Sequence, residues 1–233
     1  MQITYIGHSG FLVEFRNCYC IFDYYKGTLP TLEPRKPILV FSSHAHGDHY
    51  NPKIFELLKE QEMARVIAIL SKDIPERRWP DMALLNPGTL EFQKVTFYQT
   101  YELPCGVTVQ TLHSTDRGVA YIVRCDNCVI FHAGDLNDWS FDETFANYSE
   151  QKNKQMTGSY RHEIDLLCKL LEGTSLDAAF LPLDPRQGKC YSKGMLYFLE
   201  KIDVKKVYPM HYWDKPEIVE QFLKEHPEYK DLF

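Results

Sequence analysis

The stretch Ser42–Tyr50, with the sequence SSHAHGDHY, gathers three histidines and one aspartate within six positions of a chain that has only nine histidines. The apolar run Ile38–Phe41 precedes it and is typical of a buried strand. Asn51 and Pro52 follow, and they provide an N-cap and a first-turn proline for a helix expected over residues 53–59. We therefore expect the stretch on a loop at the carboxyl end of a strand, where α/β folds commonly place their functional residues.

The overall composition is that of a globular protein. The chain has 233 residues, of which 44% are hydrophobic and 25% are charged. No repeat, low-complexity segment or change of composition marks a linker, so the sequence predicts a single domain over residues 1–233. The formal net charge of −6 disfavours a general affinity for nucleic acid.

No apolar run approaches the ~20 residues that a membrane-spanning helix needs, and the first residues do not resemble a signal peptide. We therefore expect no membrane partner and a cytoplasmic location. The seven cysteines are an odd number in a chain too large to need disulfides, so free thiols are the simpler interpretation. The sequence leaves open whether the chain forms a homo-oligomer.

Hydrophobic periodicity gives a coarse order of elements. Strands are expected at 3–6, 11–15, 18–22, 38–41, 65–70, 82–85, 90–92, 95–101, 107–112, 119–124, 128–131, 176–183 and 206–210, with a turn at 86–88. Helices are expected at 53–59, 160–171, 195–202 and 216–225. Two β-rich halves that each carry helices suggest two sheets packed face to face, with helices outside.

The histidine-rich loop has the spacing of a metal site. His44 and His46 lie two positions apart, so their imidazoles point to the same side of an extended segment. Gly47 lets the backbone bend, so that Asp48 and His49 can point to a second position. Four such ligands can serve two ions, and imidazole with carboxylate suits Zn²⁺, Mn²⁺ or Fe.

The motif His44-x-His46-x-Asp48-His49 resembles the signature of the metallo-β-lactamase superfamily of hydrolases. Later residues resemble the remaining ligands of that family, in the family's order: His113 after a strand, Asp135 in a Gly-Asp pair, and His211 after the last strand. The resemblance implies a four-layer αββα sandwich with a binuclear metal site. It implies that one metal is held by His44, His46 and His113, that the other is held by Asp48, His49 and His211, and that Asp135 contacts both.

The reaction implied by the resemblance is hydrolysis. Two divalent ions, most simply Zn²⁺ with Mn²⁺ or Fe as alternatives, would share a bridging hydroxide that attacks an ester-like centre. Asp48 and Asp135 are the catalytic carboxylates in this interpretation, and the acid that protonates the leaving group is either water, Asp48 or a nearby group. The two carboxylates and the hydroxide leave a net positive charge, which favours a small anionic substrate.

Four further residues are expected near the metals. Asp23 resembles the family's buried aspartate that orients a metal-bound histidine, although a strand-end aspartate is nearly as good an interpretation. His8 in a Gly-His turn resembles the branch that includes ascorbate-6-phosphate lactonase, and a turn histidine without a role is the alternative. Arg186 is expected to bind an anionic group unless it only pairs with Asp184. Tyr212 is expected to line a pocket unless it only packs.

Residues 136–162 interrupt the β pattern with a polar stretch, which we interpret as a helical lid over the site or as a solvated connector. The branch resemblance favours a phosphorylated sugar lactone or a phosphodiester as substrate. A nucleic-acid phosphodiesterase of the same fold stays open, although no nuclease accessory segment is visible. A non-catalytic binding module that keeps the metals stays open too.

Overall fold

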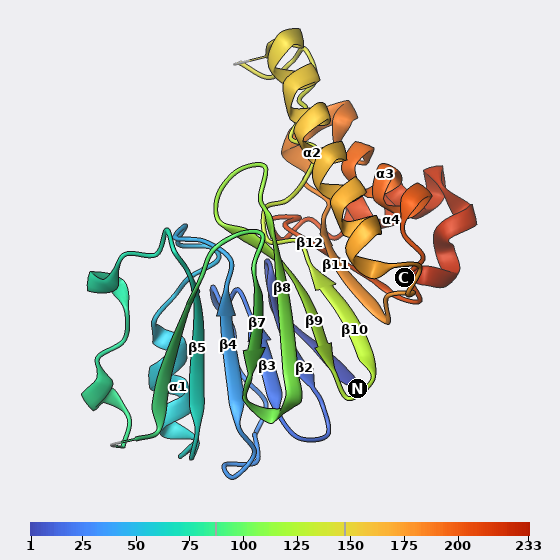
Figure 1. Cartoon of the computed structure of the whole chain (residues 1–233). Coiled ribbons are helices and arrows are strands. Elements are labelled where there is room, and N and C mark those ends of the chain that lie inside the picture. Colours follow the sequence, from blue (N-terminus) through green and yellow to red (C-terminus); the bar gives the residue numbers. More distant parts are fainter. Residues whose placement is uncertain (87, 147) are drawn as a thin grey trace.

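The computed structural model describes residues 1–86, 88–146 and 148–233, and its strands form two six-stranded mixed sheets (Figure 1). In spatial order, the first sheet contains β1 (Gln2–Gly7), β2 (Gly10–Glu14), β3 (Tyr19–Phe22), β4 (Ile38–Ser42), β5 (Val66–Ser71) and β6 (Leu90–Val95). In the same sense, the second contains β12 (Val207–Met210), β11 (Ala178–Pro182), β10 (Cys128–His132), β9 (Val119–Cys125), β8 (Val107–His113) and β7 (Thr100–Leu103). Strands β3 to β6 are parallel, as are β10 to β12, and the other neighbours are antiparallel.

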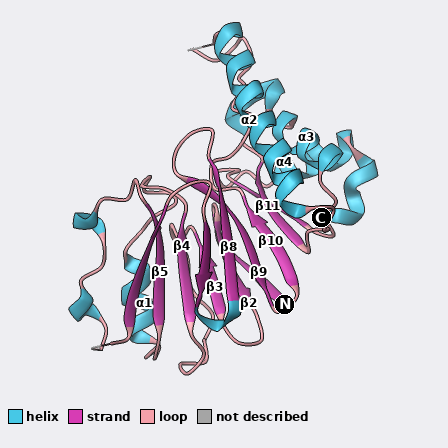
Figure 2. Ribbon diagram, viewed as in Figure 1, coloured by secondary structure: helices cyan, strands magenta, loops and turns pink. Residues whose placement is uncertain are grey.

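Helices cover the outer faces of both sheets. They are α1 (Lys53–Glu60), α2 (Glu150–Leu171), α3 (Lys193–Lys201) and α4 (Glu217–Glu225), and short 3₁₀ turns lie at Glu76–Arg78, Met82–Leu84, Pro104–Gly106, Pro185–Cys190 and Pro227–Leu232. Helix α1 lies against the first sheet, whereas α2, α3 and α4 lie on the side of the second (Figure 2). Among the described residues, no helix combines the length and apolar character needed to cross a membrane.

Strand β4 shows why the first sheet needs cover on both faces. Its side chains alternate, so that Leu39 and Phe41 pack between the sheets while Ile38 and Val40 pack toward α1. The residues of α1 that meet this outer face are Ile54, Phe55 and Leu58. A parallel strand buried on both faces reads as a continuous apolar run, which is the pattern of residues 38–41.

The second sheet is covered by the carboxyl-terminal half of α2. Tyr160, Ile164 and Leu167 recur at helical spacing and are buried in the core. The hydroxyl of Tyr160 donates to the carbonyl of Gly194, which ties α2 to α3 (2.8 Å). Helix, sheet, sheet and helix therefore follow one another, and the predicted αββα architecture is confirmed.

Two of the expected strands are wrong. Residues 82–85 form a 3₁₀ turn at Met82–Leu84, because the side chain of Asp81 accepts a hydrogen bond from the amide of Ala83 (2.8 Å). The strand expected over 95–101 is broken, since β6 ends at Val95 and Tyr98 adopts a φ of +59° before β7 begins. The turn expected at 86–88 includes Pro87, which lies outside the described residues.

Helix α2 begins at Glu150, ten residues before the expected start at Tyr160. The side chain of Ser149 caps it by accepting a hydrogen bond from the amide of Lys152 (3.3 Å). The first turns are mostly exposed, and they rise beyond the sheets in Figure 1. Polar composition hid this half of the helix, because only the second half has an apolar face to bury.

Segments far apart in sequence meet at one edge of the sandwich. The turn between β1 and β2 contacts the end of β12, where the amide of His211 donates to the carbonyl of His8 (3.3 Å). The same turn contacts β10, because Nε2 of His132 donates to the carbonyl of Ser9 (3.0 Å). The loop after β4 contacts the start of β9 through the amide of Val119 and the carbonyl of Ser43 (3.0 Å). This edge gathers the side chains described next.

Candidate metal centre

The loop after β4 carries two fully buried histidines, His44 and His49, and the more exposed His46. It turns tightly, since the carbonyl of His46 accepts hydrogen bonds from the amides of His49 (3.1 Å) and Tyr50 (2.9 Å). The bend does not depend on Gly47, as the sequence suggested. Gly47 does not have a positive φ, and a Cβ added to it would have no atom of another part of the chain within 4 Å.

Two glycines outside the loop, Gly118 and Gly134, are needed for the loop to pack in its place. Gly118, at the start of β9, has a φ of +71°, and a Cβ there would lie 1.9 Å from the carbonyl oxygen of Ser43. Gly134, just after β10, has a φ of +53°, and its Cβ would lie 2.7 Å from the Cβ of Ser43. Both glycines therefore let their strands approach the backbone that presents His44.

Asp135 lies at the middle of the centre. Its Oδ2 lies 3.3 Å from Nε2 of His44, and its Oδ1 lies 3.0 Å from Nε2 of His49 and 3.4 Å from Nε2 of His211. Burial alone would raise the pKa of this carboxyl group. The positive charge of His49 outweighs burial and holds the pKa of Asp135 well below its usual range.

Potential ligand atoms gather in three overlapping groups, within each of which they lie within 4.8 Å of one another. Asp135 belongs to two of the groups, and so does His49. The groups are His8, Asp48, His49 and His211; His44, His49 and Asp135; and His46, Asp116 and Asp135. The sequence prediction for the loop, Asp135 and His211 thus corresponds to one connected cluster, which also contains His8 and Asp116.

Asp23 fixes the imidazoles of the loop. It is fully buried at the end of β3 and accepts hydrogen bonds from the amide (2.7 Å) and hydroxyl (2.7 Å) of Ser43 and from Nδ1 of His49 (2.8 Å). Because the Ser43 hydroxyl gives its proton to Asp23, it must accept one from Nδ1 of His44 (3.0 Å). Both histidines therefore present the Nε2 lone pair to the centre.

Asp184 orients the last histidine in the same way. Its Oδ2 accepts from Nδ1 of His211 (2.8 Å) and from the indole of Trp213 (3.1 Å), and Nε of Arg186 donates to it as well (2.9 Å). Burial alone would raise the pKa of Asp184, but the hydrogen bonds from His211 and Arg186 lower it to about 2. From the buried strand before it, the sequence placed Asp184 with Arg186 on the same rim as the metals, as a partner of Arg186. It did not predict the hydrogen bond from His211.

The cluster fits divalent cations. Three imidazoles present Nε2 lone pairs to one small buried volume beside Asp135, and such an arrangement is costly unless a cation neutralises it. Oδ1 of Asp135 and Nε2 of His49 are buried without a hydrogen-bond partner among the described residues. Burial alone would lower the pKa of His49, yet the charges of Asp135 and Asp23 raise it well above its usual value. The centre therefore favours positive charge.

His113 does not reach the cluster. It ends β8 with an exposed side chain, and its ring packs edge-on against Phe97 with the ring centroids 4.5 Å apart. Neighbouring strand residues alternate in direction, so the residue after buried Leu112 points away from the interior. The chain then turns and brings in Asp116, whose Oδ2 lies 3.7 Å from Nδ1 of His46. Sequence reasoning missed Asp116, although it lies only three positions after His113.

His132, a further buried histidine, has a structural role. Nε2 donates to the carbonyl of Ser9, Nδ1 accepts from the amide of Gly134 (3.2 Å), and the ring stacks on Phe22 at 5.0 Å. Both ring nitrogens are therefore engaged by the backbone. Burial also lowers the pKa of His132 below its usual value, which is consistent with a neutral side chain.

A cavity of about 580 Å³ opens beside the cluster. At one end it is lined by the potential ligands His46, Asp48, Asp116, Asp135 and His211. Most of the remaining lining comes from residues 139–145 and 148–156, which include several aromatic side chains. Residues 136–140 of the expected lid are buried, and only the part from Glu150 onward is helical, while Asn147 lies outside the described residues. This segment forms a wall of the cavity.

The two expected substrate-binding residues differ in their placement. Arg186 lines the cavity, but its guanidinium pairs with Asp184 and lies 4.3 Å from the ring centroid of Trp213. Tyr212 is absent from the lining and stacks on Tyr5 at 5.8 Å. Tyr212 therefore packs, which was the alternative to a pocket role, and the next residue, Trp213, lines the cavity. His211 and Trp213 both have positive φ, so the backbone does not continue as a strand after Met210.

Comparison with known proteins places the chain in a family. Residues 2–150 match the family model described as the beta-lactamase superfamily domain. A UPF0173 metal-dependent hydrolase of Nanoarchaeum equitans is 26% identical over 228 residues, which cover 91% of this chain and 84% of the relative. A UPF0173 metal-dependent hydrolase of Opitutus terrae is 28% identical over 146 residues, and the match covers 58% of this chain and 63% of the relative.

Solved structures agree with the fold. The metallo hydrolase Igni18 of Ignicoccus hospitalis superimposes with a TM-score of 0.57 at 18% identity, covering 96% of this chain and 90% of that one. The zinc-bound PqqB of Methylobacterium extorquens superimposes with a TM-score of 0.59 at 11% identity, covering 95% of this chain and 83% of that one. At such low identity these likenesses concern the fold alone.

Proposed function

The chain belongs to the metallo-β-lactamase superfamily, and from this premise we propose that it is a binuclear metal-dependent hydrolase. The observation that carries the proposal is the convergence of the Nε2 atoms of His44, His49 and His211 on the two carboxylate oxygens of Asp135. In this assignment one ion is held by His44, His46 and Asp116, the other by Asp48, His49 and His211, and Asp135 contacts both. Zn²⁺ suits these ligands, with Mn²⁺ or Fe as alternatives.

The ions, when bound, would supply a nucleophilic water at neutral pH and polarise the oxygen that gains charge during hydrolysis. The protein's own contribution is to fix the ligands: Asp23 and Ser43 set the tautomers of His44 and His49, and Asp184 sets that of His211. The acid for the leaving group stays open. Water fits, and so does Asp48, which is only partly buried and lines the cavity.

The charge balance bears on the substrate. Three carboxylates, Asp48, Asp116 and Asp135, together with the hydroxide, would offset all four positive charges of two divalent ions. The ions would therefore attract an anion less strongly than if His113 had taken the place of Asp116. Lys152, on the cavity wall, and Arg186 supply further positive charge. We therefore propose a substrate with one anionic group, such as a lactone that carries one or a phosphodiester.

The apolar part of the cavity lining suggests that the substrate also has an apolar part. The residues of this wall are Trp139, Phe141, Phe145, Tyr148 and Met156. The wall is held in place, because Asn153 of α2 binds the amide (3.1 Å) and carbonyl (2.7 Å) of Phe141.

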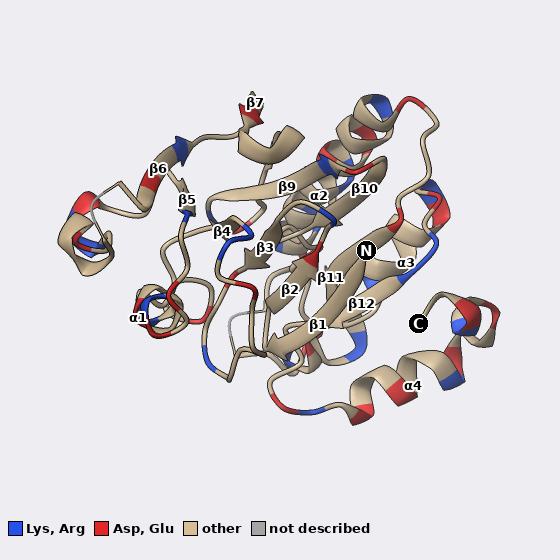
Figure 3. Ribbon diagram, turned by 90° about the horizontal axis from the view of Figure 1, so that it is seen from below, with Lys and Arg blue, Asp and Glu red and all other residues tan. Residues whose placement is uncertain are grey.

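Basic residues are interspersed with acidic ones over the ribbon in Figure 3. A small molecule that carries an apolar group suits this aromatic wall.

The direct test is a hydrolase screen of the zinc- or manganese-loaded protein. Each class of substrate (phosphodiester, lactone and thioester) is tested as a pair of compounds, one with a methyl group and one with a phenyl group at the same position. Structured RNA is tested as well. We expect turnover that a chelator abolishes and that is higher for phenyl members. Hydrolysis of RNA alone would favour a nuclease, and a metal-loaded protein without any turnover would favour a binding module.

The wall is tested with a matched pair of variants. Phe145→Ala removes a partly exposed aromatic ring of the cavity, whereas Phe97→Ala removes a similarly exposed ring outside it. We expect Phe145→Ala to raise KM about tenfold for a phenyl substrate, as burial of an aromatic group predicts, and to leave the methyl analogue nearly unchanged. Phe97→Ala should change neither, and equal effects of both variants would contradict this role of the wall.

A second pair of variants tests whether Asp116 or His113 is the metal ligand. Asp116→Asn should lower the affinity for one ion by ~100-fold or more, a loss at least as large as those reported for outer residues of metal sites. His113→Ala should leave both ions bound, because His113 packs on Phe97 outside the cluster. Metal per chain after dialysis, measured by elemental analysis, distinguishes the two. If His113→Ala loses an ion and Asp116→Asn does not, His113 is the ligand, as the sequence predicted, and the assignment of Asp116 is wrong.

A further inference from the structure

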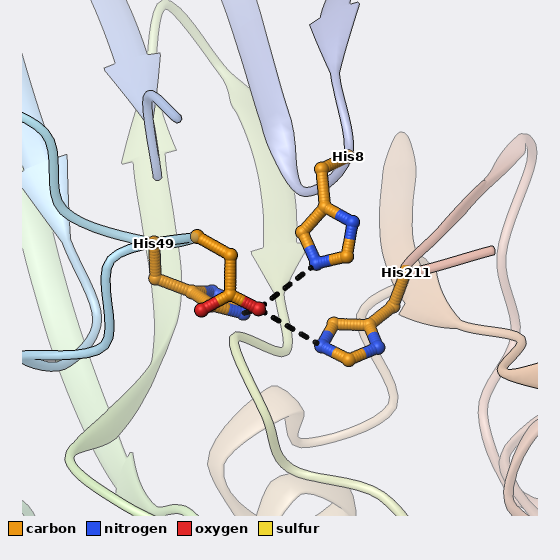
Figure 4. Close-up of side chains that lie close together, drawn as sticks. His8, His49 and His211 are labelled. Carbon is orange, nitrogen blue, oxygen red and sulfur yellow. Dashed lines mark ion pairs between the residues drawn. The ribbon is translucent and has the colours of Figure 1, made fainter. Parts of the chain in front are cut away.

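We propose that His8 is itself a metal ligand, which completes a site of three histidines and one aspartate with Asp48, His49 and His211. The sequence placed His8 only near the site, as a supporting residue or a turn histidine. The inference rests on the proposed function, because it concerns one of the two ions. Figure 4 shows the three rings turned toward a common point, with ion pairs drawn between them and a carboxylate.

The backbone holds His8 in an unusual conformation. Its φ is +57°, a region that costs a non-glycine residue roughly 1–3 kcal/mol and persists only where the surroundings enforce it. The enforcing contact is the hydrogen bond from the amide of His211 to the carbonyl of His8. The ring packs between His211 and Trp213, with both pairs of ring centroids 4.4 Å apart. The imidazole is therefore aimed at the centre before any ion binds.

The aimed nitrogen has no other partner. Nε2 of His8 is buried, only 5% of the residue is exposed, and the atom makes no hydrogen bond within the described residues. It lies 3.3 Å from Oδ2 of Asp48. Two ligands of a tetrahedral Zn²⁺ with bonds of ~2.0–2.1 Å are roughly 3.3–3.4 Å apart. The separation is thus that of two atoms bound to one ion.

The other pairs in this group lie farther apart and share the same carboxylate oxygen. Nε2 of His49 and Nε2 of His211 each lie 4.0 Å from the same Oδ2 of Asp48. Asp184 and Asp23 occupy the Nδ1 atoms of His211 and His49, which leaves their Nε2 atoms for the ion. Four donors surround one point, and Asp135 adds a fifth from the side of the other ion.

The competing role for His8 is to position Asp48 by a hydrogen bond. The two roles differ in what loss of the imidazole does. A positioning residue would leave the number of ions unchanged and lower affinity by about 10–100-fold. A ligand's loss would remove one ion, or weaken it by more than ~100-fold, and would change the coordination of that ion alone.

The experiment is a Co²⁺ titration of the metal-free protein, followed by visible absorption, for wild type, His8→Asn and His113→Asn. Asparagine tolerates the left-handed backbone of residue 8, so the fold is expected to persist. His113→Asn is the matched control, because His113 lies outside the cluster. We expect wild type and His113→Asn to bind two equivalents with the same spectrum. His8→Asn should bind the first equivalent normally and the second more than ~100-fold more weakly, with an altered spectrum for that ion only.

Two equivalents bound by His8→Asn with a wild-type spectrum would overturn the ligand role. A crystal structure of zinc-loaded wild type, with anomalous scattering to locate the ions, tests it without any substitution. An ion at bonding distance from Nε2 of His8 supports the proposal, and an ion beyond ~3 Å contradicts it. If wild type binds fewer than two ions per chain, the binuclear function itself fails. If it binds two and none approaches His8, only the present inference fails.

Discussion

Asp135→Asn is expected to abolish hydrolysis and to weaken both ions at once. Asp135 is the residue whose two carboxylate oxygens face different histidines, with His44 on one side and His49 and His211 on the other. An amide keeps the shape of the side chain but loses the charge that compensates for two cations. The NH₂ group of the amide would also direct hydrogen-bond donors toward one of the two metal positions. Activity should fall about 10³-fold or more, the scale seen when a member of a catalytic unit is removed.

Elemental analysis after dialysis and the turnover of the best substrate from the screen measure this effect. The matched control is Asp203→Asn, which makes the same substitution at an exposed position before β12. Thermal unfolding of the metal-free proteins checks that Asp135→Asn still folds. A folded variant that keeps two ions at wild-type affinity would show that Asp135 does not join the two sites.

Much of this centre could be predicted from the sequence, because its densest part is local. His44, His46, Asp48 and His49 lie within six positions after an apolar run, so both the strand and the loop were readable. Asp135 and His211 follow strands that end at the same edge, and that placement made them credible ligands. The αββα order followed from the alternation of apolar runs with helical spacing.

The sequence is least informative where the direction of a side chain depends on distant partners. His113 and Asp116 lie three positions apart, and only the turn between β8 and β9 decides which of them enters the cluster. Tyr212 and Trp213 are neighbours, and the positive φ of Trp213 belongs to a backbone that periodicity does not describe. The value of a glycine was misjudged for the same reason. Gly47 has open space around it, whereas Gly118 is pressed against a loop that lies far away in the sequence.

These two glycines yield the second prediction, which concerns stability. At Gly118 an added methyl group would lie 1.9 Å from the Ser43 carbonyl oxygen and 2.6 Å from Cβ of His44, in a left-handed backbone. Because one of these atoms belongs to the backbone, no side-chain rotation relieves the contact. Gly118→Ala should therefore destabilise the protein by roughly 3 kcal/mol or more, the combined scale of left-handed strain and overpacking. For a chain of this size that corresponds to a Tm lower by roughly 10 °C.

Gly118→Ala should lower metal affinity as well, since Ser43 carries the hydrogen bonds that set the tautomer of His44 and bind Asp23. Gly47→Ala is the matched control in the histidine-rich loop itself. With no atom within 4 Å of the new methyl group, it should change stability by less than ~0.5 kcal/mol and keep both ions. Calorimetry of the metal-free proteins and metal per chain after reloading measure the pair. If Gly47→Ala proves the more damaging change, the loop bends as the sequence first suggested, and the close packing of β9 on Ser43 does not hold the centre together.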